Sequence, residues 1–363
     1  MDVHVEVTDG RNDKRLVIAS AATGTPMGAQ VYQEEIVSRA EPALNATEPH
    51  WSVSRTIVRS LRSPLPGDVR LPMGLTRRLS PAARRELGRL IYRDQPTVVH
   101  RMDLELPPYA GRDVITLHDV VAWRFNDEAP PVPAASQEAR QAAAVICVSN
   151  FTAQEAMDFL GIRNPQVVYN GVSPRFFDAP PLDESSLNRL GIHQPYVLTM
   201  GGASRRKNLT GLADAWPVIH ASRPDLALVL AGPPHPRRTE LFLGRTGVRL
   251  IGRVADDLVP GLVAAASVLL IPSLYEGFGL PALEGMAANV PVVAARTSAL
   301  PEVVGDGGIL VEPTGDELAE GTLWAASGDS RIGEIVRRGH ARAAEFTWER
   351  SALGHARVWT SLL

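Results

Sequence analysis

The segment between Ala264 and Asn289 constrains the fold most, because an apolar run, a tight turn and a helical run follow one another there. The apolar run ends at Ile271 and is typical of a buried strand. The helical run begins near Pro281. Proline fits the first turn of a helix because its missing N–H would have no partner there. The segment therefore predicts a strand that passes through a turn directly into a helix.

The turn carries two carboxylates, Glu276 and Glu284, around the sequence Gly-Phe-Gly-Leu-Pro. Gly277 and Gly279 allow backbone N–H groups to face outward, and exposed N–H groups at a helix N-terminus bind anions. Carboxylates suit hydroxyl-rich ligands because they accept hydrogen bonds from sugar hydroxyl groups. We therefore interpret the turn as a site for a phosphate that carries a sugar. The alternative is an ordinary strand–turn–helix whose glutamates only cap the helix and face solvent.

The composition is that of a soluble globular protein. The 363 residues suffice for two α/β domains, and 45% of them are hydrophobic and 21% charged. The single cysteine, Cys147, lies in an apolar run, which favours a buried thiol over a nucleophile. No apolar segment reaches the roughly 20 residues of a membrane span, and acidic residues near the N-terminus do not fit a signal peptide. We therefore expect a cytoplasmic protein, at most peripheral at the inner face of the membrane.

Charge is unevenly distributed along the chain. The net charge of −3 gives no indication of nucleic-acid binding. The segment 51–94, however, holds ten arginines and only three acidic residues. We favour a solvated helical face for this segment. The alternative is a patch for anionic lipid head groups or for a phosphorylated acceptor, which would give peripheral membrane contact.

The first half opens with the pattern of a Rossmann-like unit. Arg15–Ser20 is typical of a buried strand, the loop after it contains Gly24 and Gly28, and a helix is predicted at Ala29–Arg39. The chain has no complete Gly-x-Gly-x-x-Gly at this point, which argues against a dinucleotide. We therefore expect no cofactor.

Short apolar runs and helical patterns alternate through the rest of the chain. Strands are predicted at Pro96–His100, Asp113–Leu117, Ala144–Ser149, Tyr196–Met200, Leu226–Leu230, Val248–Ile251, Val268–Ile271, Pro291–Ala294 and Gly308–Val311. This alternation is typical of doubly wound parallel sheets. We expect two α/β domains, residues 1–178 and residues 194–346, with a linker rich in proline and acidic residues at Ser173–Leu190.

The turn also resembles the signature of an enzyme family. Its Glu-x7-Glu spacing, from Glu276 to Glu284, is similar to that of retaining glycosyltransferase family 4, the glycosyl transferases group 1. The loop Gly201-Gly-Ala-Ser-Arg-Arg-Lys-Asn208 resembles the Gly-x-x-x-x-Arg-Lys-Asn loop of that family. The resemblance implies the GT-B fold, in which two Rossmann-like doubly wound domains face each other across a cleft. It also implies that the last helix, residues 347–363, crosses back to the first domain.

The resemblance assigns the groups that would hold a nucleotide-sugar donor. Arg206 and Lys207 would hold the diphosphate, and Gly201 and Gly202 would let the backbone approach it. Glu284 would hold the ribose hydroxyls. These residues form the donor site that we expect in the second domain.

The same resemblance places further groups around the transferred sugar. Glu276 would contact its hydroxyls, and the N–H groups of Phe278, Gly279 and Leu280 would line the sugar or the distal phosphate. His118, at the end of an apolar strand, resembles the histidine that reaches the transferred sugar. A histidine at a strand end is otherwise a structural residue, which is the alternative here.

Two further loops complete the expected site. The base would lie near Gly252, Arg253 and Val254, in the loop after a predicted strand. Gly28 belongs to the loop that faces the cleft in the family, with Met27 at a position where a glycine is often found.

The expected mechanism follows from how charge on the leaving group is stabilised. A departing diphosphate builds negative charge, which fixed cations or a metal ion can stabilise. The sequence has no Asp-x-Asp, and its acids and histidines are scattered, so we expect Arg206 and Lys207 to act without a metal. No dedicated nucleophile stands out, so we expect front-face transfer with retention. The leaving phosphate would take the proton of the acceptor hydroxyl.

The predicted function is therefore transfer of a hexose from a UDP-, GDP- or ADP-sugar to a hydroxyl of a sugar, a lipid-linked acceptor or a small molecule. One alternative is a sugar-nucleotide epimerase of the same fold, which would need a further acid–base set. The other alternative is a non-catalytic, transferase-like partner subunit. Loss of the basic loop or of the acidic pair would favour it, and Lys207, Glu276 and Glu284 are all present.

Overall fold

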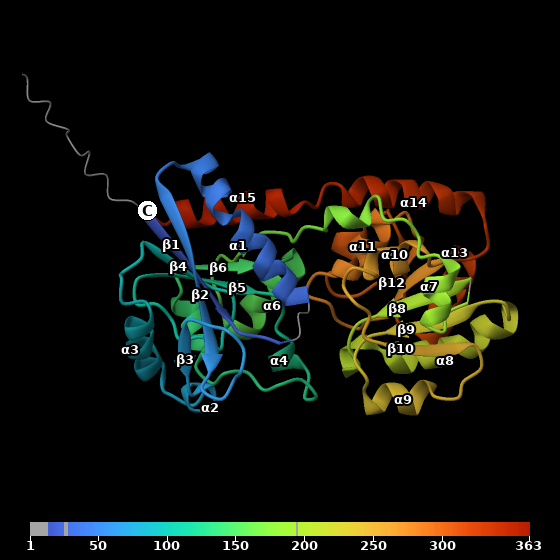
Figure 1. Ribbon diagram of the computed structural model, residues 1–363, viewed down its shortest axis with the longest axis horizontal. Coiled ribbons are helices and arrows are strands. Elements are labelled where there is room, and N and C mark those ends of the chain that lie inside the picture. Colours follow the sequence, from blue (N-terminus) through green and yellow to red (C-terminus); the bar gives the residue numbers. More distant parts are fainter. Residues whose placement is uncertain (1–13, 25–27, 194) are drawn as a thin grey trace, which may run out of the picture. The chain divides into compact units, whose positions relative to one another are not determined.

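The computed structural model describes residues 14–24, 28–193 and 195–363. It contains two parallel β-sheets, one of seven and one of six strands, with helices packed around them (Figure 1). The chain divides into two compact units. The first holds residues up to Thr116, residues 132–145 and residues 352–363, and the second holds residues 117–131 and 146–351. The predicted boundaries at residues 178 and 194 stay a prediction.

The seven-stranded sheet has the order β3-β2-β1-β4-β5-β6-β7. Its strands are β1 (Lys14–Ala21), β2 (Trp51–Ser60), β3 (Val69–Leu71), β4 (Val98–Arg101), β5 (Arg112–Leu117), β6 (Ala144–Cys147) and β7 (Gln166–Val167). The central strand β1 is buried from Leu16 to Ser20, as a strand covered on both faces requires. Cys147 ends β6 with no exposed surface, which confirms the predicted buried thiol.

The six-stranded sheet has the order β10-β9-β8-β11-β12-β13. Its strands are β8 (Tyr196–Met200), β9 (Ala227–Ala231), β10 (Val248–Gly252), β11 (Val268–Ile271), β12 (Val292–Ala295) and β13 (Ile309–Val311). The chain runs outward from β8 to β10 and then returns to the other side of β8 at β11. In parallel sheets, ligands bind at the carboxyl ends of strands where the order reverses in this way. The loops after β8 and β11 are therefore the first place to look for a site.

Helices connect the strands of both sheets. They are α1 (Gly28–Thr47), α2 (Met73–Thr76), α3 (Pro81–Ile91), α4 (Val121–Arg124), α5 (Ala135–Gln141), α6 (Asn150–Leu160), α7 (Glu184–Arg189), α8 (Leu209–Ser222), α9 (Pro236–Phe242), α10 (Val259–Ala264), α11 (Leu280–Ala287), α12 (Leu300–Val304), α13 (Gly315–Ala325), α14 (Ser330–Ala343) and α15 (Trp348–Thr360), with the 3-10 helices η1 (Pro174–Phe176) and η2 (Arg205–Lys207). None of the described helices is long and apolar enough to cross a membrane.

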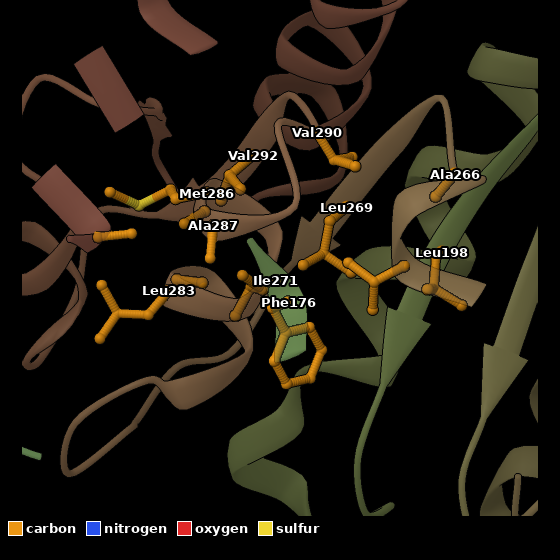
Figure 2. Packing of buried hydrophobic residues seen from close by; sticks show 14 of the residues in the cluster. Phe176, Leu198, Ala266, Leu269, Ile271, Leu283, Met286, Ala287, Val290 and Val292 are labelled. Atoms are coloured by element: carbon orange, nitrogen blue, oxygen red, sulfur yellow. The ribbon is translucent and has the colours of Figure 1, made fainter. Parts of the chain in front are cut away.

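The predicted strand–turn–helix is present, because β11 passes through a turn into α11. Figure 2 shows the core that joins them: Leu269 and Ile271 of β11 lie beside Leu283 and Met286 of α11. Pro281 is in the first turn of the helix, as predicted. The tight packing of both elements fixes the turn between them.

The segment predicted as a linker is instead packed into that core. Phe176 and Leu187 are 1% and 2% exposed, and Phe176 lies among the side chains in Figure 2. Its proline and acidic residues begin short helices. Pro174 is the first residue of η1, and Asp183 caps α7 by accepting a hydrogen bond from the Ser186 N–H.

The arginine-rich segment is not one helical face, because it begins with β2 and β3. Several of its arginines have protein partners: Arg55 pairs with Glu34, and Arg77 pairs with Glu105. Arg84 is fully buried. Membrane contact by this segment stays a prediction.

A buried charge network holds the loops of the first unit. Arg84 donates to Glu138 at 2.6 Å, and Arg101 donates to Asp113 at 2.7 Å. The Arg101 guanidinium also lies 3.5 Å from Glu138. Further N–H groups of both arginines donate to the Leu106 carbonyl at 2.9 and 2.7 Å. A network of this kind is favourable only while each buried charge keeps its partners.

We expect Glu138→Ala to lower the free energy of unfolding of the first unit by about 3–5 kcal/mol, because the buried Arg84 guanidinium would lose the carboxylate that it pairs with. Urea denaturation followed by fluorescence measures this change. Glu86→Ala is the control, since Glu86 pairs with Arg89 on the surface and should contribute less than about 1 kcal/mol. Equal effects of the two substitutions would contradict the assigned role of the network.

Candidate donor site

The loop after β8 is anchored beside the end of β11 by Asn208. Asn208 has a φ of +51°, and its side chain accepts a hydrogen bond from the Gly211 N–H, which caps α8. Its Nδ2 group donates to the carbonyls of Pro272 at 3.0 Å and Pro313 at 2.9 Å. Asparagine is among the few residues that tolerate this left-handed backbone and can cap a helix as well. The basic residues of η2 therefore lie next to the acidic turn.

An ion-pair cluster forms where the two loops meet. Lys207 Nζ lies 2.6 Å from Glu276 Oε1, and Arg206 Nη1 lies 3.5 Å from Glu276 Oε2. Ser273 Oγ donates to the same Glu276 Oε1 at 2.7 Å. Glu276 is 8% exposed. The structure thus brings together Arg206, Lys207 and Glu276, three residues that the sequence placed in the site.

These contacts decide the charge states of the cluster. Burial would raise the pKa of Glu276, but Lys207 and Arg206 outweigh it and lower the pKa below its ordinary value. Burial likewise opposes the charge of Arg206, yet Glu276 and Glu128 raise its pKa. The carboxylate is therefore ionised at neutral pH, and Arg206 stays charged.

Two acids that the sequence analysis missed also hold the basic loop. Glu128 Oε1 accepts a hydrogen bond from Arg206 Nε at 2.8 Å, and Asp127 Oδ2 accepts one from the Arg205 N–H at 2.6 Å. They follow a short helix 78 residues earlier in the chain, and no motif marks them. An anion that binds Arg206 must compete with Glu128.

Close packing explains Gly277. A Cβ atom on this residue would lie 1.8 Å from the carbonyl oxygen of His118, so only glycine fits. The Gly277 carbonyl accepts hydrogen bonds from the hydroxyls of Ser149 at 2.6 Å and Thr152 at 3.0 Å. Close packing is therefore a reason for glycine at this position in addition to the expected outward-facing N–H groups. The contact also brings His118 to the acidic turn.

The N-terminal end of α11 has free donors. Gly279 has a φ of +105°, a left-handed backbone that favours glycine. The N–H groups of Phe278, Gly279 and Leu280 donate to no group in the described part of the chain. The Phe278 side chain is itself 4% exposed and packs against Phe346, so only its backbone can reach a ligand. Amides arranged in this way suit an oxyanion.

Glu284 is a carboxylate without a hydrogen bond to any residue that the structure describes. Burial raises its pKa to about 7, and Arg175 partly opposes the rise. A partly buried acid without a hydrogen-bond donor costs free energy when it is ionised, so it gains from a ligand that brings hydroxyl groups.

Other predicted residues are placed as follows. Gly252 ends β10 with a φ of +70°, and its carbonyl accepts a hydrogen bond from the Gly232 N–H at 2.7 Å. Arg253 after it is exposed, and Val254 packs partly buried against the core. Gly28 is the first residue of α1, and Met27 lies outside the described residues. Their part in donor binding stays a prediction.

No group of three or more His, Cys, Asp or Glu side chains in the described ranges is arranged to hold a metal ion.

Two family models match the chain. The model described as Glycosyltransferase Family 4 matches residues 32–176, and the one described as Glycosyl transferases group 1 matches residues 194–327. The second match spans the basic loop and the acidic turn.

Curated relatives and a solved structure agree with these matches. O-antigen chain mannosyltransferase B of Escherichia coli is 30% identical over 270 residues, which cover 69% of this chain and 71% of that protein. The GDP-mannose-dependent alpha-(1-6)-phosphatidylinositol dimannoside mannosyltransferase of Mycobacterium tuberculosis is 31% identical over 275 residues, covering 74% and 68%. Sucrose-phosphate synthase from Thermosynechococcus elongatus has the same fold, with a TM-score of 0.75 at 21% identity over 96% of this chain and 99% of that one. The chain therefore belongs to the family 4, group 1 glycosyltransferases, enzymes of the GT-B fold that take a sugar from a nucleotide-sugar donor.

Proposed function

We propose that the protein transfers mannose from GDP-mannose to a hydroxyl group of a glycan or lipid-linked acceptor, with retention and without a metal ion. One observation carries the proposal: Glu276 is held ionised between Lys207 and Arg206 beside a glycine loop. The names of the two relatives, both mannosyltransferases and one GDP-mannose-dependent, support the choice of sugar and nucleotide. The membrane-lipid and O-antigen acceptors in those names support the acceptor class.

In the proposed complex, Lys207 and Arg206 bind the diphosphate oxygens. As the bond between the anomeric carbon and the phosphate oxygen breaks, negative charge grows on the phosphate, and both cations stabilise it. The amides of Phe278, Gly279 and Leu280 line the sugar or its phosphate. Both cations already lie in the site before the donor arrives, and Arg206 exchanges Glu128 for a phosphate oxygen on binding.

Glu276 serves the sugar rather than attacking it. Its Oε1 already accepts hydrogen bonds from Lys207 and Ser273, and its pKa is lowered, so the carboxylate is a good hydrogen-bond acceptor and a weak nucleophile. We therefore infer a front-face reaction. The acceptor oxygen bonds to the anomeric carbon on the side from which the phosphate leaves, and its proton passes to a phosphate oxygen.

We expect GDP-mannose to raise the melting temperature of the chain more than UDP-glucose or ADP-glucose does, because a ligand that binds only the folded state stabilises it. With an acceptor, NMR of the product should show the α-anomer that the donor carries, at a rate that EDTA leaves unchanged. A preference for another donor would refute the choice of GDP-mannose. An inverted product, or a rate restored only by added Mg²⁺, would refute the mechanism.

We expect Lys207→Ala to weaken GDP-mannose binding by about 10- to 100-fold, the value of one charge-assisted hydrogen bond. Isothermal titration calorimetry measures the change. Arg205→Ala is the matched control, because the neighbouring Arg205 is exposed and should change the affinity by less than about threefold. If Lys207→Ala binds the donor as tightly as the wild type, the diphosphate assignment is wrong.

Glu284 should make donor binding depend on pH. Its pKa of about 7 means that it is mostly protonated at pH 6, and the ionised form is the stronger hydrogen-bond acceptor for the two ribose hydroxyls. GDP-mannose should therefore bind about tenfold tighter at pH 8 than at pH 6, and Glu284→Gln should abolish the difference. The nucleotide sugar is the right probe because its diphosphate diester does not titrate in this range.

Stability gives a second test of the same carboxylate. The pKa of Glu284 is higher in the folded chain than in the unfolded chain. The free energy of unfolding therefore falls as the pH rises from about 4.5 to about 7, and it stays constant at higher pH. Glu284→Gln should thus raise the melting temperature at pH 8 and leave it unchanged at pH 4. If the melting temperature of the variant depends on pH as that of the wild type does, another group is responsible for the titration.

A further inference from the structure

Arg238 of α9 is a buried cation beneath the glycine loop, and the expected site does not include it. It is 4% exposed, and its guanidinium donates to the carbonyls of Gly201 at 2.7 Å, Gly202 at 3.2 Å and Pro233 at 3.1 Å. Within the described ranges, no carboxylate pairs with Arg238, and its buried Nε has no hydrogen-bond partner. Burial without an anion lowers its pKa. An unpaired buried charge is costly, so it calls for an explanation.

We propose that Arg238 is a positioning residue of the donor site: it orients the Gly201–Gly202 loop so that successive amides point at the donor diphosphate. This inference rests on the proposed function, because it needs the diphosphate to bind over this loop. It adds a residue and a set of backbone donors to the side chains of Lys207 and Arg206.

Peptide geometry gives the direction of those amides. In a trans peptide the C=O of one residue and the N–H of the next point in opposite directions. Because Arg238 draws the carbonyls of Gly201 and Gly202 to one side, the N–H groups of Gly202 and Ala203 face the other side. Neither N–H donates to any group that the structure describes. Consecutive free N–H groups form a concave anion site.

The sequence around Arg238 is fitted to this contact. Gly232, after β9, has a φ of +142°, and a Cβ atom there would lie 2.0 Å from the Gly201 oxygen and 2.9 Å from the Arg238 guanidinium. Glycine at this position therefore allows Arg238 to reach the loop. A Cβ atom on Gly201 would lie 3.7 Å from Lys207 Nζ, so the loop that Arg238 holds also adjoins the lysine of the site.

The charge of Arg238 contributes at longer range. Its own contacts are neutral carbonyls, so its full positive charge adds to the potential over the loop. In a site of low dielectric constant such a charge acts more strongly than it would in water. A diphosphate bound on the opposite face would thus compensate a charge that the folded protein leaves without an anion.

Calorimetric titration with GDP and with guanosine tests the proposal on the full chain. Arg238→Met should weaken GDP binding about tenfold or more and leave guanosine binding unchanged, since only the diphosphate contacts the loop. Arg238→Lys, which keeps the charge but cannot reach three carbonyls, should give an intermediate loss. Arg237→Met on the same helix is the control and should bind both ligands as the wild type does.

Several results would overturn the proposal. GDP affinity unchanged in Arg238→Met contradicts it, and so does an equal loss for GDP and guanosine, which would show a merely structural role. If Arg238→Met does not fold, the affinities of Arg238→Lys for GDP and for guanosine provide the same test. A failure of the proposed function would look different, because in that case the wild type itself would not bind GDP. Suppose that the wild type and both Arg238 variants bind GDP equally well, while Lys207→Ala does not bind it. That result would refute only the role of Arg238.

Discussion

The contact between Lys207 and Glu276 is the interaction on which the rest of the site depends. A carboxylate that is 8% exposed stays ionised only because two cations adjoin it, and the cations stay in place because the carboxylate holds them. The pair joins the loop after β8 to the turn after β11, neighbouring strands at the point where the sheet order reverses. The fold thus places fixed charge of both signs at one edge of one sheet.

The proposed donor has anionic phosphates and neutral hydroxyl groups, which require cations and hydrogen-bond acceptors, respectively. In the proposed complex, fixed cations would bind the diphosphate, and carboxylates would bind hydroxyl groups. Glu276 is kept charged by its neighbours, and Glu284 is kept partly neutral by burial. Glu128 pairs with Arg206 at 2.8 Å, so an anion that binds Arg206 has to compete with this carboxylate. Arg238, which is 4% exposed, lies against the Gly201 carbonyl and would add positive charge that solvent screens little.

Local chemistry made much of the fold predictable. The strands Tyr196–Met200 and Val268–Ile271 have the predicted bounds, because a fully buried parallel strand is a continuous apolar run between turn residues. β2 was missed because arginines interrupt its apolar residues, and the ion pair that accommodates Arg55 comes from α1. The linker prediction failed for a similar reason, since Phe176 and Leu187 pack against partners far along the chain.

Some residues of the candidate site could likewise be predicted from the sequence, and others could not. Arg206, Lys207 and Glu276 were found because their loops follow strands and carry a recognisable pattern. Glu128 and Arg238 were not, because each acts through one contact between distant segments. The close approach of the His118 carbonyl to Gly277 could not be predicted either, because His118 belongs to another loop.

A crystal structure of the chain with GDP-mannose bound tests the central claim most directly. The account predicts diphosphate oxygens at hydrogen-bond distance, about 3 Å, from Lys207 Nζ and from the Gly202 amide, with a mannose hydroxyl on Glu276. A diphosphate bound elsewhere, with Lys207 still paired only to Glu276, would contradict it.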